Sequence, residues 1–183
     1  LVTSVDNPVG FYYKFTADII LNDTASDNWH ENAHSWMYST WSQYETSKGF
    51  RGSFDGNGHI VSGIYLDVEN KNGQVLAGLI PVIGENGEIK NVGVTNSFIS
   101  GYDLRYGNGW IGGIVGYCHD WKISDDVSTE TCKATISGCF VDKTVTVGGQ
   151  VAGGILGATP RSVLIENCYS LCNLVSNSDG RVG

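Results

Sequence analysis

The sequence predicts an all-β protein folded as a parallel β-helix, or β-solenoid, of about four coils with loop insertions. Three observations lead to this fold class. The 183 residues include 25 Gly but only 3 Pro and 1 Met, and Val, Ile and aromatic residues dominate the apolar set, which favours strands joined by turns. Two short motifs recur along the chain. Their mutual spacing is fixed except for insertions, as is typical of a repeat architecture.

The first motif surrounds an aliphatic pair with glycines, and the second begins with a β-branched residue. The first motif reads AGLIPVIG at 77–84, GGIVGY at 112–117 and GGILGA at 153–158. The second reads VSGIYL at 61–66, IKNVGV at 89–94, ISGCFV at 136–141 and IENCYS at 165–170. The step from Gly78 to Ile89 equals the step from Gly154 to Ile165. The corresponding step from Gly113 to Ile136 is longer because of an inserted loop at 118–133.

The elements before the repeats follow in order. Residues 11–23 alternate apolar and polar side chains, which predicts a strand with one buried face. Residues 24–49 form a polar, aromatic-rich excursion that can hold a short helix. Residues 50–68 contain DGNG, a tight-turn sequence because Gly and Asn tolerate positive φ. The chain lacks the helices of ten or more residues that a doubly wound α/β fold needs between its strands.

The second motif marks successive coils. The coil from Val61 to Ile89 and the coil from Ile136 to Ile165 are nearly equal in length. The residues at the third position of the motif are Gly63, Asn91, Gly138 and Asn167. Gly and Asn enter the left-handed region most readily, so we expect a bend there in every coil. A strand follows each bend, and a third strand is expected at 96–101, 144–149 and 173–177.

The positions of the cysteines predict two core residues and leave the pairing of two others open. Cys139 and Cys168 occupy the same place in successive copies of the second motif, which predicts stacked core side chains. Cys118 and Cys132 bracket the inserted loop. They either form a disulfide or remain two unpaired thiols, because spacing alone fixes no connectivity. Cys172 has no obvious partner.

Charge and length restrict the partners. The net charge is −8 and Lys and Arg form no cluster, which argues against binding to nucleic acid. The apolar runs are too short for insertion into a membrane. Residues 180–183 have the form of 149–152, which lead into the first motif. We therefore expect 1–183 to be a single solenoid domain and a fragment of a longer repeat protein, with further repeats of the same parent chain beside it.

The run FRGSFDGNGHIVSGIYL at 50–66 resembles the F-x-G-x-F-D-G-N-G-H-x-I-x-G-L stretch of bacterial GLUG-motif proteins. The first motif looks like the GLUG motif itself, and KFTADIILND with Trp41 is similar to the elements before it. The resemblance covers most of 11–183, except for the excursion and the inserted loop. It implies a β-solenoid from a large secreted or cell-surface bacterial protein, of the kind found in adhesins and in the non-catalytic part of IgA-specific metallopeptidases.

One motif indicates metal chemistry. His30-Glu31-Asn32-Ala33-His34 matches HExxH, in which an α-helix presents two His to Zn²⁺ and a Glu to water. The flanking residues are polar, unlike those of zincin helices, and the extended form would need Gly and His at 37 and 40, where Met and Thr stand. A third ligand would come from Glu45, Asp55 or His59. An incidental polar loop competes with this interpretation.

Two weaker patterns concern carboxylates. DGNGHI begins like a calcium loop, but His59 and Ile60 replace the residues expected at its fifth and sixth positions, so a structural turn is preferred. Asp125 and Asp126 in the inserted loop suggest the acidic pairs of β-helical pectin-degrading enzymes. A solvated acidic loop is the simpler interpretation. We therefore expect no cofactor unless zinc or calcium binds at one of these places.

Aromatic residues outside the motifs are candidate ligand contacts, because flat rings on a rigid scaffold form platforms for sugars or proteins. The candidates are Trp29, Trp36, Tyr38, Tyr44, Trp110 and Trp121. The competing interpretation is that some of them cap the open end of the solenoid. Three functions follow: a non-catalytic surface module that binds a glycan or a host or partner protein, as in adhesion; a structural stalk; or a zinc-dependent hydrolase using residues 30–34. The first is preferred, so a catalytic role is the less favoured one.

Overall fold

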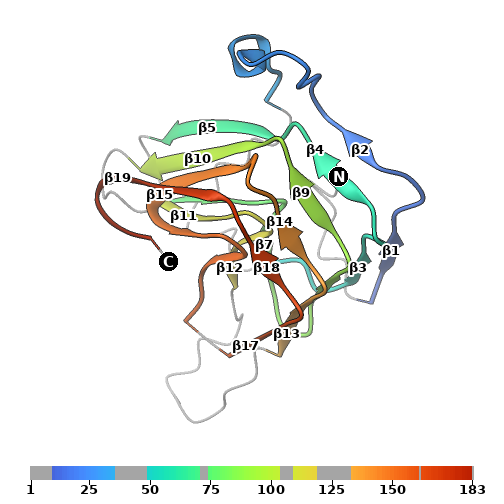
Figure 1. Cartoon of the computed structure of the whole chain (residues 1–183). Helices are drawn as coiled ribbons and strands as arrows, with labels where there is room; N and C mark the ends of the chain where they lie inside the picture. Colours follow the sequence, from blue (N-terminus) through green and yellow to red (C-terminus); the bar gives the residue numbers. More distant parts are fainter. Residues whose placement is uncertain are drawn as a thin grey trace.

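The computed structural model describes residues 10–35, 49–70, 74–103, 109–118, 133–160 and 162–182, and in it the chain folds as a parallel β-helix. Short strands from successive coils pair in register to build parallel sheets along the sides of the helix. Figure 1 shows β2, β4, β9, β14 and β18 following one another across the molecule in sequence order. The predicted all-β solenoid is confirmed.

Four sheets form the walls. Sheets A, B and C take at most one strand from a coil, whereas sheet D takes two short strands or one long strand. Sheet A contains β1 (Tyr12–Lys14), β3 (Ser53–Asp55), β8 (Glu88–Lys90), β13 (Ala134–Ser137) and β17 (Val163–Glu166). Sheet B contains β2 (Ile19–Ile20), β4 (Ile60–Ser62), β9 (Gly93–Thr95), β14 (Phe140–Val141) and β18 (Tyr169–Ser170). Sheet C contains β7 (Ile80–Ile83), β12 (Val115–Cys118) and β16 (Leu156–Ala158).

Sheet D turns through a corner of the helix. It contains β5 (Tyr65–Asn70), β6 (Val75–Ala77), β10 (Phe98–Asp103), β11 (Gly109–Gly112), β15 (Thr146–Gly153) and β19 (Asn173–Val182). The long strand β15 pairs with β10 through its first half and with β11 through its second half. The excursion contains a 3-10 helix, η1 (Trp29–Asn32), where a short helix was expected.

The core consists of apolar residues stacked at equivalent positions in successive coils, because alternate strand residues point inward. In sheet A the inward ladder is Phe54, Ile89, Ile136 and Ile165. Ile89 and Ile136 are fully buried, whereas Ile165 in the last coil is 43% exposed. The sheet B ladder of Val61, Val94 and Val141 is also fully buried.

The four positions predicted to bend do have positive φ, but one of them was placed in the wrong corner. Asn91, Gly138 and Asn167 (φ +53°, +60° and +54°) join sheet A to sheet B in successive coils. Gly63 (φ +74°) instead joins sheet B to sheet D, and its N–H donates to the carbonyl of Asn96, which also has positive φ. In these two coils the corner between sheets B and D therefore uses the same Gly or Asn signature as the corner between sheets A and B, whereas no described residue between β14 and β15 or between β18 and β19 has positive φ.

Coil lengths change with this correction. Phe54, not Val61, is equivalent to Ile89, so the coil that ends at Ile89 is longer than the sequence motif suggested. The coil from Ile89 to Ile136 is longer still, and the coil from Ile136 to Ile165 is the shortest of the three. The additional sequence of the longest coil falls between β10 and β11 and between β12 and β13, and the second of these places contains the predicted insertion at 118–133.

The repeated glycines of the first motif are explained by a sharp reversal between sheets D and C. A Cβ on Gly112 would overlap the carbonyl oxygen of Val115, and a Cβ on Gly153 would overlap that of Leu156. The three copies are in register, with Ile80, Val115 and Leu156 paired. The backbone therefore closes on itself at a place where only glycine fits.

The predicted cysteine stack is present. The Cys139 N–H donates to Sγ of Cys168 at 3.4 Å, and Cys139 is fully buried. Burial raises the pKa of the Cys139 thiol to about 12, so it is an inert core residue. Cys118 is buried, while Cys132 lies outside the described residues, so their pairing stays a prediction. The Ser170 hydroxyl donates to Cys172 Sγ at 3.2 Å.

Candidate functional site

Trp29 ties the excursion to the body of the β-helix. Its ring meets the ring of Tyr65 edge-on, with centroids 6.0 Å apart, and Tyr65 stacks on Phe98 at 5.9 Å. Tyr65 and Phe98 are Cα partners on β5 and β10. All three side chains are half-buried, so each keeps an exposed part. Trp29, which was predicted as a ligand contact, therefore lies at the end of a row of rings that continues with Tyr65 and Phe98 on the β-helix.

Acidic side chains continue along the same outer face of β5 and β10. Along these strands, outward side chains alternate with inward ones such as Leu66 and Ile99. Asp67 and Glu69 therefore point outward on the same face as Tyr65, and both are exposed. The Tyr102 hydroxyl donates to Glu69 Oε1 at 2.8 Å, and this bond, together with desolvation, raises the pKa of Tyr102.

We name this surface the aromatic–acidic face. Its members are Trp29, Tyr65, Asp67, Glu69, Phe98 and Tyr102. Of these six residues, only Trp29 was predicted from the sequence as a ligand contact. The missed signal is the alternation in YLDVE at 65–69, in which every second residue is aromatic or acidic.

Trp110 belongs to a separate stack. It lies on β11, and its ring stacks on that of Tyr117 from β12, with centroids 4.3 Å apart and an interplanar angle of 24°. Both side chains are half-buried. The stack spans the corner between sheets D and C, which is consistent with a packing role. The other predicted aromatic contacts (Trp36, Tyr38, Tyr44 and Trp121) lie outside the described residues.

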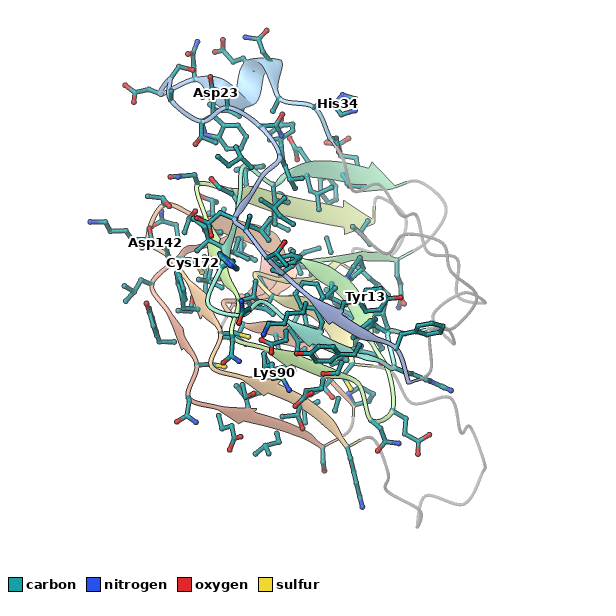
Figure 2. The ribbon with its side chains drawn as sticks, turned by 90° about the vertical axis from the view of Figure 1, so that its right-hand side faces the viewer. Tyr13, Asp23, His34, Lys90, Asp142 and Cys172 are labelled. Atoms are coloured by element: carbon teal, nitrogen blue, oxygen red, sulfur yellow. The ribbon has the colours of Figure 1, made fainter. Side chains whose placement is uncertain are left out.

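The HExxH segment does not adopt the geometry that a zincin requires. The helix η1 is a 3-10 helix of four residues, and Ala33 after it is extended (φ −68°, ψ 139°), so His30 and His34 are not one α-helical turn apart. The backbone N–H and C=O of His34 bond to the side chain of Asn22 at 2.8 and 2.9 Å. Figure 2 shows His34 beside this helix, well separated from Lys90 on sheet A.

Two of the three candidates for a third zinc ligand already contact other side chains, and the other lies outside the described residues. Asp55 bonds to Tyr12, and the His59 ring lies 3.0 Å from Asp18. Glu45 lies outside the described residues. Within the described ranges no three His, Cys, Asp or Glu side chains are grouped as metal ligands. Zinc binding by His30 and His34 stays a prediction that this geometry does not support.

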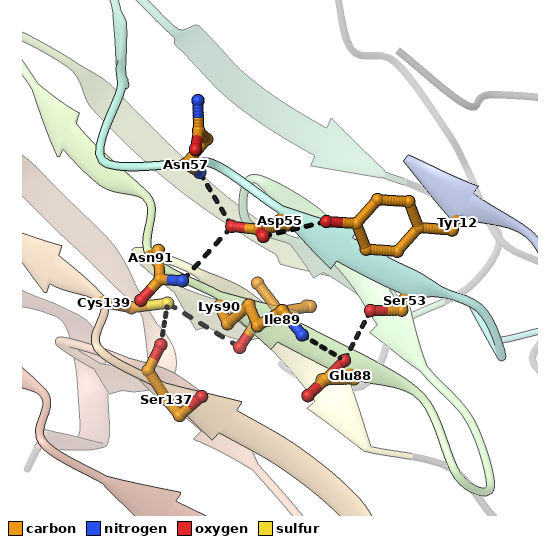
Figure 3. Close-up of polar contacts among 10 residues, drawn as sticks. All are labelled: Tyr12, Ser53, Asp55, Asn57, Glu88, Ile89, Lys90, Asn91, Ser137 and Cys139. Atoms are coloured by element: carbon orange, nitrogen blue, oxygen red, sulfur yellow. Dashed lines mark hydrogen bonds and ion pairs between the residues drawn. The ribbon is translucent and has the colours of Figure 1, made fainter. Parts of the chain in front are cut away.

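The DGNG turn uses Asp55 as a hydrogen-bond acceptor (Figure 3). Asp55 Oδ1 accepts the Asn57 N–H at 2.8 Å and the Asn91 side-chain amide at 3.2 Å, and Oδ2 accepts the Tyr12 hydroxyl at 2.9 Å. These bonds, the one from the Asn57 N–H first, lower the pKa of Asp55. A structural turn is therefore favoured over the calcium loop, because both carboxylate oxygens already have protein donors.

Glu88 lies beside this turn on sheet A and is also paired. It accepts hydrogen bonds from the hydroxyl of Ser53 and from Nζ of Lys90, the latter at 2.9 Å. These two bonds lower the pKa of Glu88. A general acid needs a carboxyl group with a raised pKa, so neither Asp55 nor Glu88 is poised for acid catalysis. The Asp125–Asp126 pair lies outside the described residues.

Comparison with known proteins gives one similarity. The chain is 27% identical over 157 residues to Halomucin of Haloquadratum walsbyi (strain DSM 16790 / HBSQ001), an alignment that covers 84% of this chain. The chain spans about 1% of the length of Halomucin. No family model and no solved structure matches the chain. In the part of the chain that is described, no helix is long and apolar enough to cross a membrane.

Proposed function

We propose that this chain is a non-catalytic binding module of a secreted or cell-surface protein, and that it binds a glycan on the aromatic–acidic face. The observation that carries the proposal is the half-exposed row of Trp29, Tyr65 and Phe98 beside exposed carboxylates. Aromatic rings pack against the C–H faces of sugars, and carboxylates accept hydrogen bonds from sugar hydroxyl groups. The similarity to Halomucin and the solenoid fold support a surface or secreted location.

A rigid base supports this binding role. Tyr65 and Phe98 stand on paired strands whose inward neighbours, Leu66 and Ile99, are buried in the core. Rings held in this way lose little conformational entropy when a ligand binds. Asp67 and Glu69 place negative charge on this face of a chain whose net charge is −8. We therefore expect neutral or amine-bearing glycans to bind and polyanionic ones to be repelled.

A glycan array followed by titration calorimetry tests the proposal. Trp29→Ala should weaken binding of the best neutral glycan about fivefold to thirtyfold, because losing one central aromatic contact typically costs about 1–2 kcal/mol. Trp110→Ala is the matched control, since it removes a half-buried Trp whose ring stacks elsewhere. It should leave affinity unchanged.

The two variants separate the competing outcomes. Loss of binding in Trp110→Ala alone would move the site to the Trp110–Tyr117 stack. Unchanged binding in both variants, or an array in which no glycan binds, would reject the aromatic–acidic face as a glycan site. Binding to a partner protein without any glycan would then favour the protein-ligand form of the adhesion hypothesis.

A further inference from the structure

The side chain of Asn22 closes a loop around Trp29. Its Oδ1 accepts the N–H of His34 at 2.8 Å, and its Nδ2 donates to the carbonyl oxygen of His34 at 2.9 Å. The amide thus binds both backbone groups of a residue that lies 12 positions further along the chain. Residues 23–33, the first part of the excursion, therefore form a loop whose ends are held together, like the compact surface loops that often carry function. We name this segment the Trp29 loop.

Asn22 also ties the Trp29 loop to the β-helix. Its Nδ2 donates a second hydrogen bond, at 2.8 Å, to the carbonyl oxygen of Gly63. Both amide hydrogens and the amide oxygen therefore have partners, which fixes the orientation of the side chain. The approach requires a glycine at position 63, because a Cβ there would lie 2.7 Å from the backbone nitrogen of Asn22.

The anchor lies next to the aromatic–acidic face. Gly63 comes two residues before Tyr65, the residue whose ring Trp29 meets edge-on. The chain that enters β5 is thus contacted twice, by Asn22 at the base of the Trp29 loop and by Trp29 near its middle. Figures 1 and 2 show this part of the excursion projecting beside β5.

Short-range hydrogen bonds shape the Trp29 loop from within. Asp23 Oδ1 accepts the N–H of Ala25 at 3.0 Å, and Asn28 Nδ2 donates to Glu31 Oε2 at 3.0 Å. Each of these bonds spans only two or three residues. They define the local conformation, whereas the bonds of Asn22 define where the loop lies on the β-helix.

Asn22-Asp23-Thr24 also has the form of an acceptor for N-linked glycosylation. The atom that would carry the sugar is Nδ2, and the sugar would replace one of its two hydrogens. Nδ2 could then no longer donate to both His34 and Gly63. The closed loop and a sugar on Asn22 therefore exclude each other, and the structure favours a positioning role for this side chain.

We propose that Asn22 positions Trp29 on the aromatic–acidic face by closing the Trp29 loop and fixing it to Gly63. Asn22 is a positioning residue, because it affects a ligand through Trp29 and not by contact. A ring that is already in place loses less conformational entropy on binding than a ring on an open loop. The expected effect on glycan affinity rests on the proposed function, whereas the expected effect on the loop does not.

Nuclear magnetic resonance of the protein without ligand tests the loop itself. In the wild type the N–H of His34 should exchange with solvent about tenfold or more slowly than an unstructured amide. The Trp29 indole should show nuclear Overhauser contacts to the ring of Tyr65. Asn22→Ala should lose both signals. Asn32→Ala is the matched control, because it removes an exposed Asn from the same loop, and it should keep both.

A double-mutant cycle tests the route from Asn22 to the ligand. Asn22→Ala should weaken binding of the best neutral glycan about threefold to tenfold, because only part of the population then holds Trp29 in place. In the Trp29→Ala background the same substitution should have no further effect. A merely structural role would weaken binding equally in both backgrounds. Asn32→Ala should bind as the wild type does.

Three results would overturn the proposal. The first is rapid exchange of the His34 N–H in the wild type, a measurement that stays decisive if circular dichroism shows that Asn22→Ala does not fold. The second is a contact between Trp29 and Tyr65 that persists in Asn22→Ala. The third is an equal loss of affinity from Asn22→Ala with and without Trp29. If no glycan binds, the proposed function fails, and the two resonance measurements still decide whether Asn22 holds Trp29.

Discussion

The corners of the β-helix depend on residues that adopt left-handed backbone conformations. Every described residue with positive φ is Gly or Asn. At Asn91 the side chain also donates to Asp55, so one residue supplies both the bend and a contact between coils. At Gly63 the backbone lies so close to the neighbouring coil that no side chain fits: a Cβ would lie 2.6 Å from the carbonyl oxygen of Asn22.

Gly63→Ala should therefore be much more destabilising than Gly58→Ala. Both residues have similar positive φ (+74° and +82°), but a Cβ on Gly58 meets no atom within 4 Å. Gly58→Ala should lower the free energy of unfolding by about 1 kcal/mol, the cost of the left-handed conformation alone. Gly63→Ala should lower it by about 3 kcal/mol, because overpacking adds to that cost. Urea denaturation measures both, and equal losses would contradict the packing explanation.

The strands obtain their stability from stacking between coils, since individual strands are only two to ten residues long. The sheet A ladder shows this dependence. Ile136 lies between Ile89 and Ile165 and is fully buried, whereas Ile165 has a neighbour on one side and is 43% exposed. The same residue type at equivalent positions is therefore in two different environments.

Ile136→Ala should lower the free energy of unfolding by about 3–4 kcal/mol, as expected for a fully buried Ile. Ile165→Ala should cost about 1 kcal/mol, because roughly half of the side chain is already in contact with water. Similar losses in both variants would mean that the last coil is covered.

The sequence was informative about strands and less so about corners. Apolar alternation and the fixed interval from Gly78 to Ile89 predicted the ladders and their register. The first copy of the second motif was misaligned because Gly63 satisfies a left-handed corner as well as Asn91 does. Trp29 was predicted as a contact, but its partners Tyr65 and Phe98 were not, since stacking between coils joins residues a whole coil apart in the sequence.

Across the whole molecule, carboxylates join segments that are distant in sequence. Asp18 accepts the N–H of Ile60, Glu88 accepts the hydroxyl of Ser53, and Asp55 accepts the amide of Asn91. The pKa of each of these three carboxyls is lowered, for Asp18 mainly by the Ile60 N–H and for Glu88 mainly by Ser53. The folded state therefore favours the ionised form of each of these three carboxyl groups.

Stability should fall in acid. A carboxyl whose pKa is lowered by folding contributes stability that is fully present above its unfolded pKa, near 4, and is lost as pH falls through the folded value. Urea midpoints should therefore decrease steadily below about pH 4. Asp55→Asn removes one such group and should flatten the decrease. An unchanged pH slope in this variant would show that the Asp55 bonds do not contribute.

Successive coils differ in length although their strands pair in the same ladders. Insertions in such a chain can therefore be tolerated without a change in the pairing of the strands. Additional sequence enters between β10 and β11 or between β12 and β13 while Ile89 and Ile136 stay paired. In the next coil β15 crosses the first of these junctions without interruption. Recognition loops can thus be lengthened, exchanged or grafted one coil at a time, while the stacked interior keeps the same periodicity.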